Sequence, residues 1–199
     1  MKRTKFALKI LAILPCVLML VSCQIRDEHS SSSILLVVEV AGYTAAGDSA
    51  DFLQSDVIEG DPLLDGSIVA DIIPATLEAK LKEPASIGAG PSYKNRIFIH
   101  TYEVRYTYVD SLNMPSTAVP ATFQGRLSVA IDIDSSETIE FVIVREQAKA
   151  ESPLSDIIID PSRLLQVVAQ ITFYGEDIAG HPVQATGYLT IYFAEYADA

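Results

Sequence analysis

The thiol of Cys23 is the side chain whose position in the sequence points most directly to a reaction. It follows a short basic segment and an apolar run over residues 6–20. A basic segment, an apolar run and a site with small residues, in this order, make up an export signal. Lys9 and Pro15 interrupt the run, which is shorter than the roughly 20 residues that a membrane-spanning helix needs. The sequence therefore predicts a signal peptide over residues 1–22.

The segment Leu20-Val21-Ser22-Cys23 resembles the lipobox of bacterial lipoproteins, in which an aliphatic, a tolerated and a small residue precede the cysteine. The resemblance covers residues 1–23. It implies thioether attachment of a diacylglycerol to Cys23 and cleavage before this residue, commonly with acylation of the new terminus. Two or three acyl chains hold a protein firmly in a membrane. Gln24, in place of the Asp that retains enteric lipoproteins in the inner membrane, favours the outer membrane of the cell envelope in a host that follows that rule.

Composition limits the partners and cofactors of the mature chain. Without residues 1–22 the chain keeps 10 basic and 26 acidic side chains, a formal net charge of −16. This balance predicts no binding of nucleic acid and no electrostatic adhesion to anionic headgroups, both of which need basic patches. Cys16 leaves with the signal and Cys23 takes the lipid, so no thiol remains for a disulfide or a metal. We expect membrane attachment through the lipid on Cys23 alone, and no cofactor.

The remainder divides into a spacer and one domain. Residues 23–33 are predicted to form a flexible tether, because they are polar and end in four consecutive serines. Residues 34–199 are enough for a single domain with its own core. Within them apolar residues recur with a period of two, which is typical of strands with one buried face. Seven strands are expected, at residues 34–40, 75–82, 98–108, 123–133, 138–143, 165–174 and 183–193.

Seven short strands separated by turn signals predict an all-β fold, an antiparallel two-sheet β-sandwich rather than a closed barrel. The strand number and the final hairpin, ending at residues 186–194, resemble immunoglobulin-like or fibronectin type III-like domains of exported bacterial proteins, although intersheet cysteines and Trp are lacking. Three long loops are expected at residues 45–67, 110–120 and 147–162. A short helix within residues 155–166, capped by Asp160-Pro161-Ser162, is a possibility in the third.

The first long loop is rich in carboxylates, which are the ligands that calcium prefers. Its candidate calcium ligands are Asp48, Asp51, Asp56 and Asp61, although the alternating acids, central Gly and closing Glu of an EF-hand are absent. A solvated acidic loop is the alternative. Residues 132–137 offer further oxygen ligands but are more typical of a hairpin turn. His29, His100 and His181 lie far apart, and no Gly-x-Ser-x-Gly motif occurs, so no catalytic residue or metal site is predicted.

The last two predicted strands carry an uncharged polar face in a strongly acidic chain. Tyr supplies a large contact area at low entropic cost, and Thr pairs well across strands. A purely structural role is the alternative, since both residues are favoured on the exposed side of any sheet. We expect this face to bind an envelope protein, a glycan or a second copy of the chain. Its residues are Gln170, Thr172, Tyr174, Thr186, Tyr188, Thr190 and Tyr192.

Together these features predict a lipid-anchored cell-envelope protein with a non-catalytic interaction or structural module. Two other functions stay open. A hydrolase would need carboxylates from the long loops to converge in a pocket. A binder of a small hydrophobic ligand would need a cavity between the sheets, which the inward positions of Gly125 and Gly187 suggest.

Overall fold

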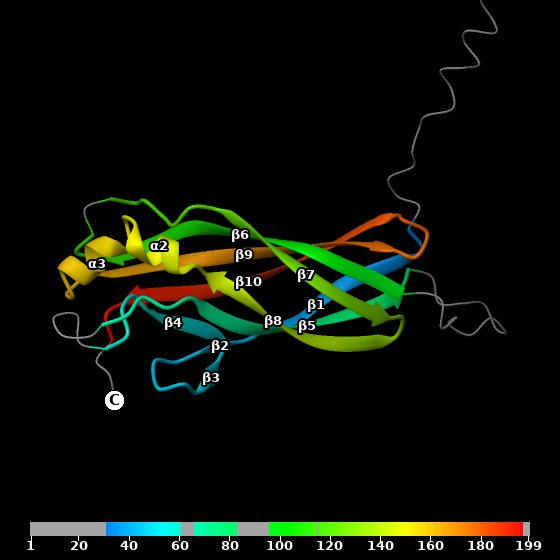
Figure 1. Ribbon diagram of the computed structural model, residues 1–199, viewed down its shortest axis with the longest axis horizontal. Coiled ribbons are helices and arrows are strands. Elements are labelled where there is room, and N and C mark those ends of the chain that lie inside the picture. Colours follow the sequence, from blue (N-terminus) through cyan, green and yellow to red (C-terminus); the bar gives the residue numbers. More distant parts are fainter. Residues whose placement is uncertain (1–30, 61–65, 83–95, 115, 197–199) are drawn as a thin grey trace, which may run out of the picture. The chain divides into compact units, whose positions relative to one another are not determined.

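The computed structural model describes residues 31–60, 66–82, 96–114 and 116–196, and this part of the chain contains ten strands (Figure 1). All seven predicted strands are present. The strands are β1 (Ser33–Val40), β2 (Gly42–Tyr43), β3 (Ser49–Ala50), β4 (Phe52–Asp56), β5 (Asp71–Leu81), β6 (Arg96–Leu112), β7 (Phe123–Asp132), β8 (Ser135–Val144), β9 (Leu164–Asp177) and β10 (Pro182–Ala194).

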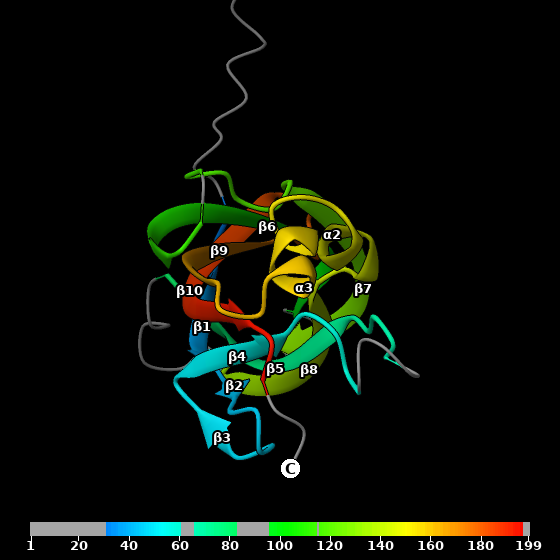
Figure 2. The ribbon, with the colours of Figure 1, turned by 90° about the vertical axis from the view of Figure 1, so that its left-hand side faces the viewer.

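Two sheets form the layers of the sandwich, which confirms the predicted all-β class. One sheet has the order β1-β5-β8 and the other β4-β10-β9-β6-β7, and β2 pairs with β3 alone. All pairings are antiparallel except that of β4 with β10, where Phe52 faces Thr190 and Asp56 faces Ala194. An end-on view shows how the five-stranded sheet curves over the three-stranded one (Figure 2).

The short strand β4 lies inside the stretch that the sequence predicts to be a long acidic loop. Only Leu53 and Ser55 of β4 are buried, and Ser55 is polar, so one apolar residue carries the alternation. That signal is too short to detect. The strand forms because its backbone pairs with the end of β10 rather than because its own sequence favours it.

The core consists of the inward side chains of both sheets. In β9, Leu165, Val167 and Ala169 alternate with partly exposed neighbours, as the period of two predicts. Tyr102 of β6, Phe141 of β8 and Phe173 of β9 form the aromatic centre, with Phe141 packed edge-on against the other two at ring distances of 5.1 and 5.4 Å. Such edge-to-face pairs stabilise a core beyond the area that they bury.

The predicted hairpin at residues 132–137 joins the two layers instead of two neighbouring strands of one sheet. β7 belongs to the five-stranded sheet and pairs with β6, whereas β8 pairs with β5. Asp134 turns the chain with a φ of 62°, and its N–H donates to the carbonyl of Ala79 at 2.7 Å. The turn therefore closes the sandwich at one end.

The third predicted loop contains two short helices, α2 (Glu146–Ala150) and α3 (Ser155–Ile159). α3 lies within the segment where a helix was a possibility, and Asp160 is its C-cap. Nothing in the sequence pattern indicated α2. Both helices lie at the end of the sandwich opposite the β9–β10 turn (Figure 1).

The folded body is a compact unit that begins at Ser31. This residue lies within the predicted tether. Ser31 and Ser33 are 6% and 3% exposed, and the carbonyl of Ser32 accepts a hydrogen bond from the N–H of Lys82 at 2.9 Å. β1 then starts at Ser33. The last three residues of the predicted tether are therefore part of the body, while the signal peptide and Cys23 lie outside the described residues.

Candidate functional site

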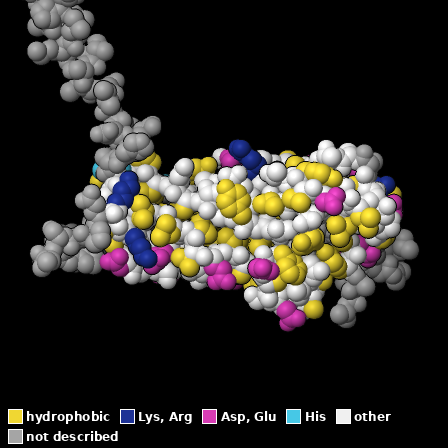
Figure 3. Space-filling view, turned by 180° about the vertical axis from the view of Figure 1, so that it is seen from behind, with side chains coloured by type: hydrophobic (Ala, Val, Ile, Leu, Met, Phe, Trp, Pro, Cys, Tyr) yellow, Lys and Arg dark blue, Asp and Glu magenta, His cyan; other side chains and the backbone are white. Residues whose placement is uncertain are grey.

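The seven residues of the predicted binding face lie together on the outer side of β9 and β10. Cross-strand register places Thr172 opposite Thr186 and Gln170 opposite Tyr188. The hydroxyl oxygens of the two threonines are 3.2 Å apart. Seen from behind, this side of the molecule shows mainly apolar and uncharged side chains, with charged groups mostly toward its margins (Figure 3). We call these seven residues the binding face.

The members of the binding face differ in what they can offer to a partner. Tyr188 is 63% exposed, whereas Thr172 is nearly buried. The ring of Tyr192 packs edge-on against Phe52 of β4, with ring centres 5.7 Å apart, and its hydroxyl accepts a hydrogen bond from Gln166. Tyr192 therefore helps to hold β4 against β10, and Tyr188 is the residue best placed to contact a partner.

Two charged residues of β6, Glu103 and Arg105, border the binding face. Glu103 lies opposite Thr172 and Arg105 opposite Gln170. The Arg105 guanidinium contacts the Glu103 carboxylate at 3.4 Å, and the side-chain amide of Gln124 donates to the same carboxylate at 3.0 Å. The charges of this border therefore largely compensate one another.

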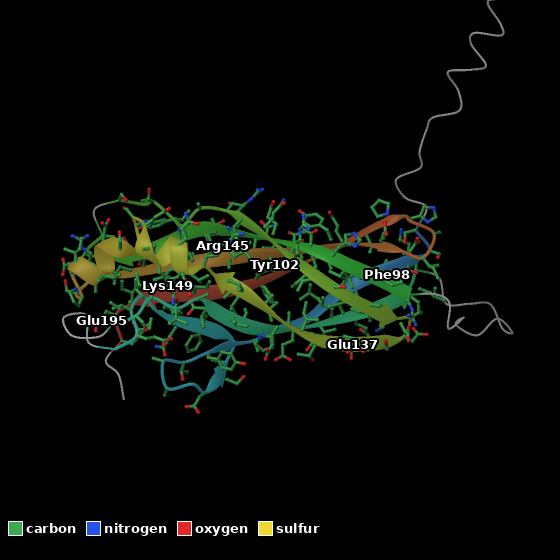
Figure 4. The ribbon with its side chains drawn as sticks, in the orientation of Figure 1. Phe98, Tyr102, Glu137, Arg145, Lys149 and Glu195 are labelled. Carbon is green, nitrogen blue, oxygen red and sulfur yellow. The ribbon has the colours of Figure 1, made fainter. Side chains whose placement is uncertain are left out.

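A groove that sequence reasoning did not find lies around Arg145, between β8 and α2. The guanidinium stacks on the ring of Phe123, 4.0 Å from its centre, and donates a hydrogen bond to the carbonyl of Gln124 at 2.5 Å. Two hollows of about 260 and 340 Å³ share Phe123, Arg145 and Gln147 in their walls. Arg145 and Tyr102, both labelled in Figure 4, line the second hollow together. Burial raises the pKa of Tyr102, which lines the second hollow, so its hydroxyl stays neutral.

A buried ion pair lies behind this groove. The Lys149 ammonium contacts a carboxylate oxygen of Asp71 at 2.8 Å and donates to the carbonyl of Asp56 at 2.6 Å. The other carboxylate oxygen of Asp71 accepts a hydrogen bond from the Ser55 hydroxyl at 2.6 Å. Burial raises the pKa of Asp71, against the opposing effects of Lys149 and Ser55.

The geometry of this cluster favours a structural role over catalysis. Lys149 is 1% exposed and Ser55 is fully buried, so no substrate reaches either group. Lys149 instead connects α2 with β4 in one sheet and β5 in the other. No pattern in the sequence indicated the pair, because its members lie 78 residues apart.

The predicted calcium ligands do not converge in the described residues. Asp48 lies in the β2–β3 turn, where its N–H bonds the hydroxyl of Thr44, and Asp51 is exposed next to β4. A carboxylate oxygen of Asp56 accepts a hydrogen bond from the N–H of Tyr196, while Asp61 lies outside the described residues. Across residues 31–60, 66–82, 96–114 and 116–196, no group of three acidic, His or Cys side chains could hold a metal ion.

The two inward glycines do not leave an empty cavity. A Cβ on Gly125 would lie 2.2 Å from the ring of Tyr102, and one on Gly187 would lie 2.9 Å from side-chain atoms of Val37 and Val40. Neighbouring side chains therefore occupy both places. These positions give no support to a hydrophobic ligand between the sheets.

The structure describes two of the three histidines. His100 is exposed on β6, and the ring of His181 lies 3.1 Å from a carboxylate oxygen of Asp177. His29 lies outside the described residues. Within residues 31–60, 66–82, 96–114 and 116–196, no helix is long and apolar enough to cross a membrane.

By its fold and these surfaces, the protein is an all-β sandwich with an open, uncharged sheet face. No protein-family model matches the chain, and no curated protein matches it in sequence.

Proposed function

We propose that this chain is a lipid-anchored cell-envelope protein whose β-sandwich is a non-catalytic binding module. The lipobox at residues 20–23 supports the anchor. The observation that carries the binding role is the exposure of Tyr188, at 63%, within an uncharged face on a chain of net charge −16 after processing. Exposed Tyr on a rigid sheet supplies contact area at little entropic cost.

The form of the binding face favours a protein partner. Its residues lie on two long paired strands, and none of them lines either hollow beside Arg145. Small ligands and sugars bind in concave sites, whereas a broad sheet face suits another protein. Because the face itself carries no charge, a partner that docks there buries no charged side chain of the face.

Replacement of Tyr188 by Ser tests the binding role. Tyr188 is exposed, so we expect the variant to fold normally and to lose crosslinks to its envelope partner in the native cell. Ile159→Ser is the matched control, because Ile159 is 80% exposed and lies away from the binding face. Tyr192→Ser is unsuitable, since the loss of its contact with Phe52 also weakens the sheet.

Three measurements decide the outcome. Crosslinking with mass spectrometry reports neighbours, sedimentation reports self-association, and the mass of the N-terminal peptide reports acylation of Cys23. Unchanged crosslinks and unchanged self-association in Tyr188→Ser would contradict the binding role. An N-terminal peptide without acyl chains would contradict the anchor.

A further inference from the structure

The point where the chain joins the body is held by a buried hydrogen-bond network. The Ser31 hydroxyl lies 3.1 Å from a carboxylate oxygen of Asp177, the last residue of β9. The other oxygen of Asp177 accepts from the N–H groups of Ala179 and His181, each at 2.9 Å. Asp177 is 6% exposed, so this contact is part of the folded structure. We call the end of the body that carries Ser31 and the β9–β10 turn the joining end.

Chain length limits how far the joining end can lie from an anchor on Cys23. Eight peptide units separate Cys23 from Ser31, a distance of at most about 28 Å in a fully extended chain. β9 has 14 residues, so the α3 end of the body lies about 43 Å beyond Asp177 at 3.3 Å per residue. Of the two ends of the body, the joining end is therefore the one that the chain keeps within about 28 Å of an anchor on Cys23.

The surface of the joining end suits contact with a lipid bilayer. Ile178, at the tip of the β9–β10 turn, is 56% exposed, and Phe98, which lies opposite Glu176 of β9, is 38% exposed. Lys80 and Arg96 lie at the same end, each paired with a carboxylate of a neighbouring residue or strand. Both cations are thus neutralised, so the exposed apolar side chains of Ile178 and Phe98 are what this end offers to lipid. Figure 4 shows Phe98 at this end, far from Lys149.

We infer that the joining end rests on the bilayer surface, with Ile178 and Phe98 against the lipid, and that the body stands with α2, α3 and the Arg145 groove directed away from it. This inference rests on the proposed lipid anchor at Cys23. Exposure alone does not select this end, because Ile159 of α3 is exposed as well. The position of Ser31 makes the choice.

The orientation has a consequence for the binding face. β10 runs from the joining end toward the helices, so Tyr188 lies about midway along the body. A standing body presents the binding face sideways, toward partners in the same membrane. A body lying on this uncharged face would cover it with lipid.

Single cysteines provide the test, because the mature chain has no thiol besides Cys23. The full-length acylated protein carries Ile178→Cys, Tyr188→Cys or Ile159→Cys, each labelled with the same environment-sensitive fluorophore. All three positions are more than half exposed, so the labels leave the core intact. The protein is placed in vesicles of phosphatidylethanolamine and phosphatidylglycerol, with and without headgroup spin-labelled lipid.

Quenching by the spin-labelled lipid is expected to be several-fold stronger at position 178 than at 159, with 188 between them. Equal quenching at all three positions, or the strongest quenching at 188, means a lying body and overturns the inference. The N-terminal peptide mass separates the two proposals. Acylated protein without the gradient overturns the orientation alone, whereas unacylated protein overturns the anchor and the orientation together.

A second variant tests the hydrogen-bond network. Asp177→Asn keeps the size of the side chain but weakens its hold on Ser31 and the turn. If the network orients the body, the difference in quenching between positions 178 and 159 shrinks in this variant. An unchanged difference would show that the network does not set the orientation.

Discussion

The two ends of the sandwich are each closed by a buried charged residue that connects the sheets, but the two residues do so differently. At the helical end, Lys149 contacts β4 of one sheet and β5 of the other. At the joining end, Asp177 of β9 contacts Ser31, just before β1. Lys149 is neutralised by a carboxylate, whereas Asp177 is held by N–H and O–H donors and His181.

This difference shows two ways to bury a charge. An ion pair loses most when one partner is removed, because the other stays buried and unpaired. A carboxylate that accepts several hydrogen bonds loses only one of them when one donor is removed, so each such substitution costs less. We therefore expect the helical end to tolerate substitution less well than the joining end.

Lys149→Ala should give the largest loss of stability. The substitution leaves the Asp71 carboxylate buried and removes the contact between the sheets, so the free energy of unfolding should fall by about 3–5 kcal/mol. Urea unfolding followed by circular dichroism measures the change. A loss smaller than that of Asp177→Asn would reverse the ranking of the two ends.

A double variant separates charge from packing at the helical end. Lys149→Met with Asp71→Asn removes both charges and keeps similar volumes, so it should be within about 2 kcal/mol of the parent protein. The same urea experiment applies. If the double variant is as unstable as Lys149→Ala, shape rather than charge dominates this end.

Asp177→Asn should have an intermediate effect that depends on pH. Although burial raises the pKa of Asp177, hydrogen bonds from His181, Ser31 and Ala179 outweigh it and hold the pKa below its usual 3.8. The ionised carboxylate therefore stabilises the fold above about pH 4, and this contribution is lost as the pH falls through the lowered folded-state pKa.

The expected cost of Asp177→Asn at pH 7 is about 1–3 kcal/mol, because a buried carboxylate loses charge-assisted hydrogen bonds. The free energies of unfolding of parent and variant should converge as the pH falls through the lowered folded-state pKa of Asp177, where the parent carboxylate becomes protonated. A difference that stays constant from pH 7 to the acid limit would contradict the assignment.

Ser31→Ala should have the smallest effect of the series. It removes one hydroxyl contact to Asp177, which keeps its other donors, so the cost is about 0.5–1.5 kcal/mol. Hydrogen exchange of the Ser33 amide, which donates to the Ser31 hydroxyl, should become faster. Ser32→Ala is the matched control, since Ser32 is exposed.

The sequence alone determined the fold class and the positions of the seven long strands, because a half-buried strand shows its period of two in every residue. It also placed the seven residues of the binding face on one surface, since alternation within β9 and β10 needs no knowledge of other strands. Strand ends were less predictable. β6 continues to Leu112 through Asp110 and Ser111, because backbone pairing with β9 extends beyond the apolar pattern.

Only the tertiary structure decided which distant residues meet. Lys149 and Asp71, Arg145 and Phe123, and Ser31 and Asp177 carry no local signal, because each pair joins segments that come together only when the sheets pack. The parallel pairing of β4 with β10 has the same cause. Local pattern reports whether a side chain faces in or out, whereas contact between remote segments depends on how the layers close.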